Sequence, residues 1–157
     1  MNLEVNAIFL QNIADAKAVL SEDEKELGVL LLDIGAQTTN VSVYYKQAPS
    51  YTTVFQKMGG DQITFDLSKG FGIPLGTAEK LKCEVGIADY ECTNELEKIQ
   101  IPAVGGRAAK IHKRSEVVDY IQPRLLEIFG TIRENLKNND LLDCINGGVV
   151  ITGGTAL

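Results

Sequence analysis

Hydrophobic residues along this chain follow two spacings, one typical of strands and one typical of helices. Continuous or alternating apolar positions predict strands at residues 3–10, 29–33, 40–45, 51–56, 96–104 and 148–152. Apolar residues three or four positions apart predict helices at residues 12–20, 61–70, 77–85 and 115–138. The acidic run at residues 21–26 is expected to be a solvated loop. The order of these elements predicts an α/β protein.

Prolines and capping residues refine the limits of these elements. Pro49 is expected to turn the chain into the third strand of a meander, and Pro102 predicts an edge position for strand 96–104. Residues 107–112 are a candidate hairpin partner for that strand. Pro123 predicts a kink or a restart in the longest helix. The expected N-caps are Asp61, Thr77 and Ser115.

Composition and charge narrow the class of protein. The net charge of −6 argues against a nucleic-acid-binding protein, which needs a basic surface. No run reaches the ~18 uncharged apolar residues that span a bilayer, and the N-terminus lacks the basic region of a signal peptide. A cytosolic location is therefore expected. The 3 cysteines form no C-x-x-C pair and the chain has 1 histidine, which indicates reduced thiols and no zinc site.

The turn between the second and third predicted strands has the chemistry of a phosphate site. It contains an acid, a glycine and two adjacent hydroxyls, namely Asp33, Gly35, Thr38 and Thr39. Backbone N–H groups in such a turn form a concavity that binds anions. The Asp33 carboxylate can hold a hydrated Mg²⁺. The turn is therefore a candidate half of a nucleotide site.

Two further glycine pairs follow a strand or open a helix. Gly59 and Gly60 precede Asp61 and a helix whose N-terminus can bind an anion, although an ordinary capped helix explains the pattern equally. Gly153 and Gly154 follow the last predicted strand. Glu79 and Lys82, three residues apart on a predicted helix, read by themselves as a surface ion pair.

One basic cluster stands out in an otherwise acidic chain. Its members are Arg107, Lys110, His112, Lys113 and Arg114. Such a cluster is either a solvated face or a surface that docks an acidic partner.

Taken together, these motifs resemble a known family. The 33–39 turn is similar to the second phosphate motif of the actin, Hsp70 and sugar-kinase superfamily, and residues 151–154 are similar to its adenosine motif. Three more segments resemble the FtsA family of bacterial actin-like cell-division proteins. They are the run 22–29, the Ala78-Glu79 pair with Lys82 and Gly86, and the P-x-V-G-G-R element at residues 102–107. The resemblance covers residues 3–157.

The resemblance implies a fragment of the second lobe of such a protein. The fold would be a ribonuclease-H-like α/β lobe, a mixed sheet with an antiparallel hairpin and flanking helices. Subdomain 2A would take residues 1–70 and 139–157, with a small α+β subdomain 2B inserted at 71–138. The first lobe, with its other phosphate loop, would lie outside this chain.

By the same resemblance, the ligand would be ATP with Mg²⁺. Asp33 would hold the metal through water, and Gly35, Thr38 and Thr39 would face the phosphates. The remaining nucleotide contacts would be Gly59, Gly60, Asp61, Glu79, Lys82, Gly153 and Gly154. Many family members have glycines and a final acid in the hairpin where this chain has Ala36, Gln37 and Asn40. These departures should affect ATP turnover more than nucleotide binding, and we expect no catalysis by the isolated chain. Because the first lobe with its phosphate contacts would be missing, we expect weak or absent ATP binding by the isolated chain.

The resemblance also implies a division scaffold and its partners. The parent protein would link the ring protein FtsZ to the cytoplasmic face of the membrane at the division site. The FtsZ C-terminal tail would dock on subdomain 2B, at Arg107, Lys113, Arg114 and Arg124. The full-length parent would also self-associate into filaments and attach to membrane through a C-terminal helix outside this chain. The alternatives are an actin-like protein of type IV pilus assembly and the lobe of a sugar or acetate kinase.

Overall fold

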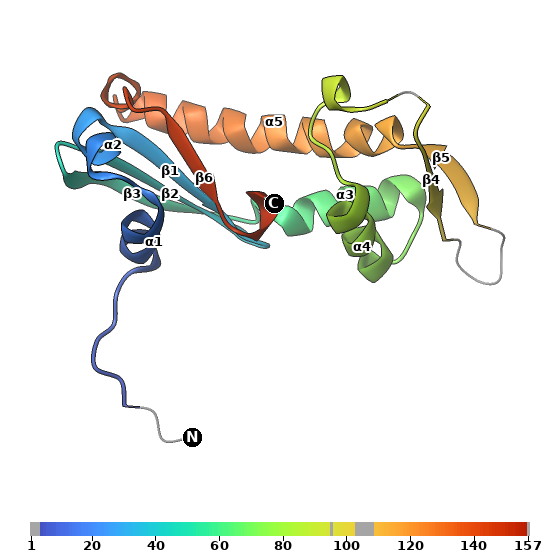
Figure 1. Ribbon diagram of the computed structural model, residues 1–157, viewed down its shortest axis with the longest axis horizontal. Helices are drawn as coiled ribbons and strands as arrows, with labels where there is room; N and C mark the ends of the chain where they lie inside the picture. The colour runs from blue at the N-terminus through green and yellow to red at the C-terminus, as the bar shows by residue number, and fades with distance from the viewer. Residues whose placement is uncertain (1–3, 95, 103–108, 157) are drawn as a thin grey trace. The chain divides into compact units, whose positions relative to one another are not determined.

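The computed structural model describes residues 4–94, 96–102 and 109–156. The chain divides into two compact units (Figure 1). Residues 1–56 and 135–157 form the first, which we call the sheet unit. Residues 57–134 form the second, which we call the inserted unit. The inserted unit thus interrupts the sequence of the sheet unit.

A mixed four-stranded sheet is the centre of the sheet unit (Figure 1). Its strands are β1 (Val29–Ile34), β2 (Thr38–Tyr45), β3 (Ala48–Gln56) and β6 (Val149–Thr152), in the spatial order β3-β2-β1-β6. The first three pair antiparallel as a meander, and β6 pairs parallel to β1. The predicted meander and the predicted last strand are therefore confirmed.

Apolar side chains fix the position of β1 in the middle of this sheet. All six residues of β1 are buried, and five of them are hydrophobic, as is typical of a strand covered on both faces. Helix α1 (Gln11–Val19) packs Ala16 on one face of the sheet, in a core with Leu20, Leu31 and Tyr44. Burial of each large apolar side chain contributes roughly 1.5–3 kcal/mol.

The β2–β3 connection is a two-residue turn at Lys46 and Gln47. Both residues have positive φ, 50° and 67°, as the tight turns that match the twist of a hairpin require. Pro49 lies inside β3 and not before it. It is tolerated there because β3 is an edge strand, where a missing N–H need not break the ladder.

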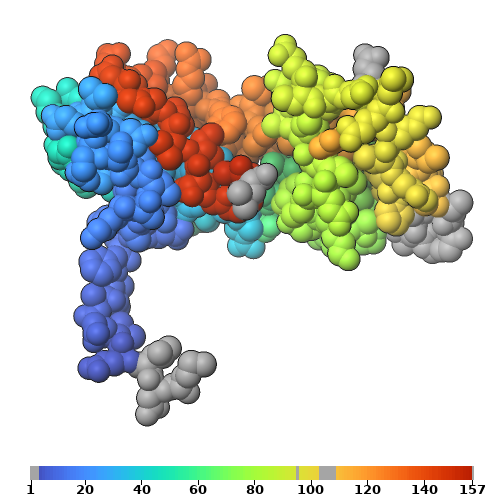
Figure 2. All heavy atoms as spheres, viewed as in Figure 1, coloured from blue at the N-terminus to red at the C-terminus, as the bar shows by residue number. Residues whose placement is uncertain are grey.

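The strand predicted at residues 3–10 is not present. Residues 4–10 have no regular structure and run away from the sheet (Figure 1, Figure 2). Their apolar side chains are exposed, with Ile8 at 91% and Phe9 at 72%. The apolar and polar positions of this segment have the pattern of a strand. A strand also needs a neighbouring strand that pairs with its backbone, and none of the described strands pairs with residues 4–10.

The loop predicted at residues 21–26 is also wrong, because helix α2 (Glu22–Leu27) occupies it. A capping box begins this helix: the Ser21 hydroxyl accepts the Glu24 N–H at 3.3 Å, and the Glu24 carboxylate accepts the Ser21 N–H at 2.7 Å. The S-x-x-E spacing that defines a capping box was present in the sequence.

The inserted unit packs three helices and a hairpin around its own core (Figure 1). Its elements are α3 (Gly60–Phe71), α4 (Leu75–Val85), β4 (Lys98–Ile101), β5 (Lys110–Lys113) and the part of α5 (Ser115–Asn138) that precedes residue 135. The core contains Ile63, Leu67, Ile73, Ala78, Leu81, Ile99, Ile101, Val117 and Ile121. The three-and-four spacing of apolar residues therefore predicted the helices of this unit and much of its core.

Several predicted details of the inserted unit need correction. Gly59, not Asp61, is the N-cap of α3, and no side chain caps it. Helix α4 begins at Leu75, so Thr77 lies inside it, because Pro74 already supplies an extended residue before the helix. Helix α5 continues without interruption through Pro123, so the predicted restart does not occur.

The second predicted hairpin is present but shorter than expected. Strand β4 covers only residues 98–101 of the predicted range 96–104, and it pairs antiparallel with β5. Pro102 follows β4 directly. Residues 103–108 lie outside the described residues, and this range includes Arg107.

Short 3₁₀ turns complete the described chain, at Tyr90–Cys92, Leu142–Cys144 and Gly154–Ala156. In the part of the chain that the structure describes, no helix combines the length and the hydrophobicity needed to cross a membrane. The division into subdomains at residues 71 and 138, which the family resemblance implies, stays a prediction. Helix α3 packs in the core of the inserted unit and therefore belongs with that unit.

Candidate functional site

Asp33 lies at the carboxyl end of β1, in the sheet unit, and is 8% exposed. Its Oδ2 atom accepts two amide hydrogen bonds, from Gln11 Nε2 at 2.6 Å and from Asn40 Nδ2 at 2.9 Å. Gln11 is the first residue of α1, and Asn40 faces Asp33 across the β1–β2 ladder. The carboxylate is therefore held in one orientation by two separate elements.

The bond from Asn40 gives a physical reason for one departure from the family pattern. An acid at position 40 would place a second carboxylate opposite Asp33, and two neighbouring negative charges repel each other. The amide of Asn40 instead donates to Asp33. The site therefore carries one negative charge fewer than the pattern with an acid.

A second carboxylate, Asp15, lies close to Asp33 from helix α1. Its pKa is raised, first by burial and then by the negative charge of Asp33. The Asp15 Oδ2 atom is buried and has no hydrogen-bond partner among the described residues. An unpaired buried carboxylate oxygen beside Asp33 suits a hard cation with oxygen ligands.

The protein side chains alone do not complete such a metal site. No group of three or more His, Cys, Asp or Glu side chains within the described residues could hold a metal ion. A Mg²⁺ ion here would take its other ligands from water or phosphate oxygens, as Mg²⁺ commonly does. The donor chemistry around Asp33 thus fits a largely hydrated Mg²⁺.

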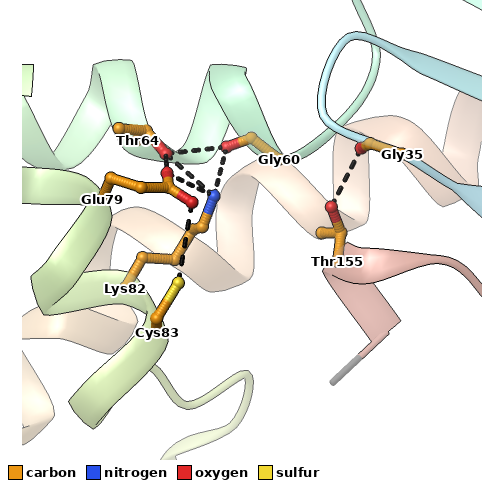
Figure 3. Close-up of polar contacts among 7 residues, drawn as sticks. All are labelled: Gly35, Gly60, Thr64, Glu79, Lys82, Cys83 and Thr155. Atoms are coloured by element: carbon orange, nitrogen blue, oxygen red, sulfur yellow. Dashed lines mark hydrogen bonds and ion pairs between the residues drawn. The ribbon is translucent and has the colours of Figure 1, made fainter. Parts of the chain in front are cut away.

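The turn after Asp33 is closed by its own backbone and by the last 3₁₀ turn. The Gly35 N–H donates to Thr38 O at 2.9 Å, and the Thr155 hydroxyl donates to Gly35 O at 2.9 Å (Figure 3). Thr39 is fully buried, whereas Thr38 is only partly so. Thr38 therefore has the more accessible of the two hydroxyls.

Gly153 lies against Asp33, although 120 residues separate them. The parallel pairing of β6 with β1 places Thr152 opposite Asp33, and Gly153 follows with φ at 94°. A Cβ atom on Gly153 would lie 2.5 Å from Asp33 Oδ1 and 2.5 Å from Ile34 O. Only glycine fits this position, so the structure joins two of the glycine motifs that the sequence predicted.

In the inserted unit, Gly59 and Gly60 open helix α3. Gly59 is extended, with φ at −164°, and Gly60 is the first helical residue. The first N–H groups of a helix have no partner within it and can bind an anion. Asp61 lies in the first turn. The start of α3 therefore stays a candidate anion site, with an acid in its first turn.

Glu79 and Lys82 of α4 meet the first turn of α3. Lys82 Nζ lies 2.7 Å from Glu79 Oε2 and donates to Gly60 O at 3.1 Å and to Thr64 Oγ1 at 2.9 Å (Figure 3). The Thr64 hydroxyl also contacts Glu79 Oε2. Hydrogen bonds from Lys82 and then from Thr64 lower the pKa of Glu79. The predicted surface ion pair is therefore part of a four-residue network.

A surface cavity of about 570 Å³ opens beside this network. Its lining residues come from the first half of α3 and the start of α4, and they are Asp61, Gln62, Thr64, Phe65, Leu75, Gly76 and Glu79. Apolar side chains and carboxylates therefore line the same depression.

Two of the basic residues predicted to bind a partner are engaged inside the inserted unit. Arg114 donates from Nε to Val85 O at 3.0 Å and from Nη1 to both Glu97 carboxylate oxygens, at 3.0 and 3.1 Å. Arg124 forms a two-bond pair with Asp66, at 2.7 and 3.1 Å, and contacts Glu127. Both guanidinium groups therefore connect separate elements of this unit.

Lys113 differs from these two arginines because its side chain is exposed. Its backbone N–H donates to Glu116 Oε1 at 2.9 Å. The other carboxylate oxygen of Glu116 lies 2.7 Å from His112 Nδ1. Arg107 lies outside the described residues.

The predicted nucleotide contacts therefore form two groups. Asp33, Gly35, Thr38, Thr39, Gly153 and Gly154 belong to the sheet unit, and Gly59, Gly60, Asp61, Glu79 and Lys82 belong to the inserted unit. Sequence reasoning missed Gln11, Asp15 and Thr64. The available signals were the i,i+4 spacing of Gln11 and Asp15, which puts both on one face of α1, and the same spacing of Gly60 and Thr64 on α3.

Comparison with solved structures identifies the class of protein. MreB5 of Spiroplasma citri bound to ADP aligns with a TM-score of 0.69 and 22% identity, over 90% of this chain and 46% of that one. A PilM–PilN type IV pilus biogenesis complex aligns with a TM-score of 0.66 and 18% identity, over 96% of this chain and 36% of that one. The chain has the actin-like α/β fold that the sequence predicts.

Comparison with sequences identifies the family. A family model described as cell division protein FtsA matches residues 30–157. The FtsA protein of Neisseria meningitidis is 38% identical over 156 residues, and that of Pseudomonas aeruginosa is 36% identical over 154 residues. These alignments cover 99% and 98% of this chain but 37% of each relative. The chain belongs to the FtsA family of cell division proteins, as predicted.

Proposed function

We propose that this chain is the second-lobe part of an FtsA-type division scaffold that binds ATP with Mg²⁺. The arrangement around Asp33 carries the proposal: a buried carboxylate is oriented by Gln11 and Asn40, beside a glycine that admits no side chain. In this proposal Asp33 holds Mg²⁺ through water. Within the sheet unit, the backbone amides of the 35–39 turn are the proposed phosphate contacts; within the inserted unit, the start of α3 is the proposed contact.

The nucleotide would act as a regulator of assembly in this proposal, and the chain by itself would not catalyse hydrolysis. Asp33 is already bonded to two amides, and Asn40 cannot act as a proton acceptor as a carboxylate would. Each lobe supplies only part of the phosphate contacts in the two-lobed arrangement that the family resemblance implies. We therefore expect weak ATP binding by this chain.

We further propose that the inserted unit docks the C-terminal tail of FtsZ, in a protein that links the FtsZ ring to the cytoplasmic face of the membrane at the division site. Of the predicted docking residues that the structure describes, Lys113 has the exposed side chain and is the one suited to contact an acidic partner. Arg114 and Arg124 would belong to the same docking surface, and their guanidinium groups also form internal ion pairs. Self-association and membrane attachment would belong to the longer protein.

Titration of a labelled FtsZ tail peptide into the chain tests this docking surface. We expect Lys113→Glu to weaken binding about three- to tenfold, because an attractive exposed charge becomes a repulsive one. Lys80→Glu makes the same charge change on α4, at another exposed lysine of the inserted unit, and is the matched control. Equal affinities for the two variants would remove Lys113 from the docking surface.

A further inference from the structure

The hydroxyl of Thr64 occupies the centre of the network between α3 and α4 (Figure 3). Thr64 lies in α3 and is 6% exposed. Its Oγ1 atom lies within hydrogen-bond distance of Gly60 O at 3.1 Å and of Lys82 Nζ at 2.9 Å, and it contacts Glu79 Oε2. One buried side chain therefore touches the helix start and two charged residues of α4, Glu79 and Lys82.

The proton count of these groups fixes the direction of the bonds. The Lys82 ammonium has three protons, and its three acceptors are Gly60 O, Thr64 Oγ1 and Glu79 Oε2. Because Thr64 accepts from Lys82, its single proton is free to be donated to the Glu79 carboxylate, which is its strongest acceptor. The Thr64 hydroxyl thus links the Lys82 ammonium to the Glu79 carboxylate through two hydrogen bonds.

We infer that Thr64 is a positioning residue, which fixes Glu79 and Lys82 relative to the Gly60 start of α3. We call Gly60, Thr64, Glu79 and Lys82 the Thr64 clamp. The inference rests on the proposed nucleotide binding, because the clamp would set the positions of three proposed contacts at once. It assigns Thr64 a role in the site without direct contact to the nucleotide.

The two charged residues of the clamp, Lys82 and Glu79, have different roles toward a ligand. All three ammonium protons of Lys82 are used within the clamp, so Lys82 acts on a ligand through the position of Gly60 and Glu79. Glu79 Oε2 is likewise occupied, whereas Oε1 has a contact of 3.6 Å with Cys83 Sγ, which is a weak donor. Oε1 is therefore the Glu79 oxygen that can accept a hydrogen bond from a ligand hydroxyl.

Two substitutions at position 64 separate the hydroxyl from the shape of the side chain. Thr64→Val keeps the branched shape and removes the hydroxyl, while Thr64→Ser keeps the hydroxyl. The first readout is the pKa of the Glu79 carboxyl, followed by ¹³C NMR during an acid titration without nucleotide. Because Thr64 contributes to the lowered pKa of Glu79, we expect a higher value in Thr64→Val and an almost unchanged value in Thr64→Ser.

The second readout is the affinity of the chain for Mg²⁺–ATP, measured at millimolar nucleotide. Loss of one charge-assisted hydrogen bond in the clamp should weaken binding about tenfold in Thr64→Val and little in Thr64→Ser. If the Thr64 hydroxyl does not position these residues, Thr64→Val should bind Mg²⁺–ATP with wild-type affinity. That result, or an unchanged Glu79 pKa in Thr64→Val, would overturn the inference.

The two readouts also separate this inference from the proposed function. If the wild-type chain binds no ATP but Thr64→Val raises the Glu79 pKa, the nucleotide proposal loses support and the clamp is retained. Thermal unfolding of each variant checks that it is folded. If Thr64→Val is unfolded, Lys82→Met replaces it, with Lys82→Arg as the control that keeps the charge and the donors. A clamp requires Lys82→Met to raise the Glu79 pKa, and an unchanged value would overturn it.

Discussion

At the scale of single residues, Gly153 shows how tightly the Asp33 region is built. Its backbone has φ at 94°, a conformation that side-chain-bearing residues rarely adopt. The space that a Cβ atom would need is already taken by Asp33 Oδ1 and by the carbonyl oxygen of Ile34. The carbonyl belongs to a central strand and cannot move without disturbing the sheet.

Gly153→Ala should therefore destabilise the chain, by about 1–3 kcal/mol, through backbone strain and the contact with Ile34 O. Gly154→Ala is the matched control, because a Cβ atom there meets nothing within 4 Å. Urea unfolding of both variants measures the difference, provided the slope of the transition is unchanged. Equal stabilities would show that β6 shifts freely against β1.

At the scale of elements, the capping box stabilises α2 as a helix although the sequence of α2 is strongly polar. The six residues of α2 include four acids and no buried side chain, so packing contributes little to this helix. Its N-terminus is stabilised by reciprocal bonds between Ser21 and Glu24, and its first-turn acids favour the positive end of the helix dipole. Local hydrogen bonding is the main reason that this segment is helical.

Ser21→Ala should consequently cost about 0.5–2 kcal/mol, the usual range for loss of an N-cap hydroxyl. Ser21→Thr keeps a hydroxyl at the same position and should stay closer to the wild type. Amide hydrogen exchange at Glu24, whose N–H is the capped group, reports the change directly. Unchanged exchange in Ser21→Ala would assign the stability of α2 to its packing against β2.

At the scale of the whole molecule, two of the cores among the described residues have different membership. Leu31 belongs to the core between α1 and the sheet, and Leu67 belongs to the core of the inserted unit. Both leucines are buried, at 2% and 0% exposure. Separate cores allow the two units to open independently, as cooperative folding units do in other proteins.

Leu31→Ala and Leu67→Ala are a matched pair that tests this independence. Each should cost roughly 2–5 kcal/mol, because each leaves a cavity in a packed core. Native-state hydrogen exchange should show lower protection mainly in the sheet unit for Leu31→Ala and mainly in the inserted unit for Leu67→Ala. Equal losses in both units for both variants would indicate a single cooperative unit.

The sequence predicted the elements whose signals are local. The apolar run that begins β1, the apolar residues at 41 and 43–45 in β2 and the long three-and-four periodicity of α5 each identify an element without reference to the rest of the chain. Residues 4–10 have an equally strong strand pattern and form none, because pairing is decided by a neighbouring strand.

By itself, the sequence determined the actin-like fold class, the FtsA family and the glycine-containing turns, because these depend on residue order and spacing. The tertiary structure alone decided what those residues contact. It placed Gly153 against Asp33, joined Thr64 to Lys82 and Glu79, and engaged Arg114 and Arg124 in internal ion pairs. The physical reason is that hydrogen bonds and ion pairs act over a few ångströms between segments far apart in sequence, and spacing along the chain does not encode that proximity.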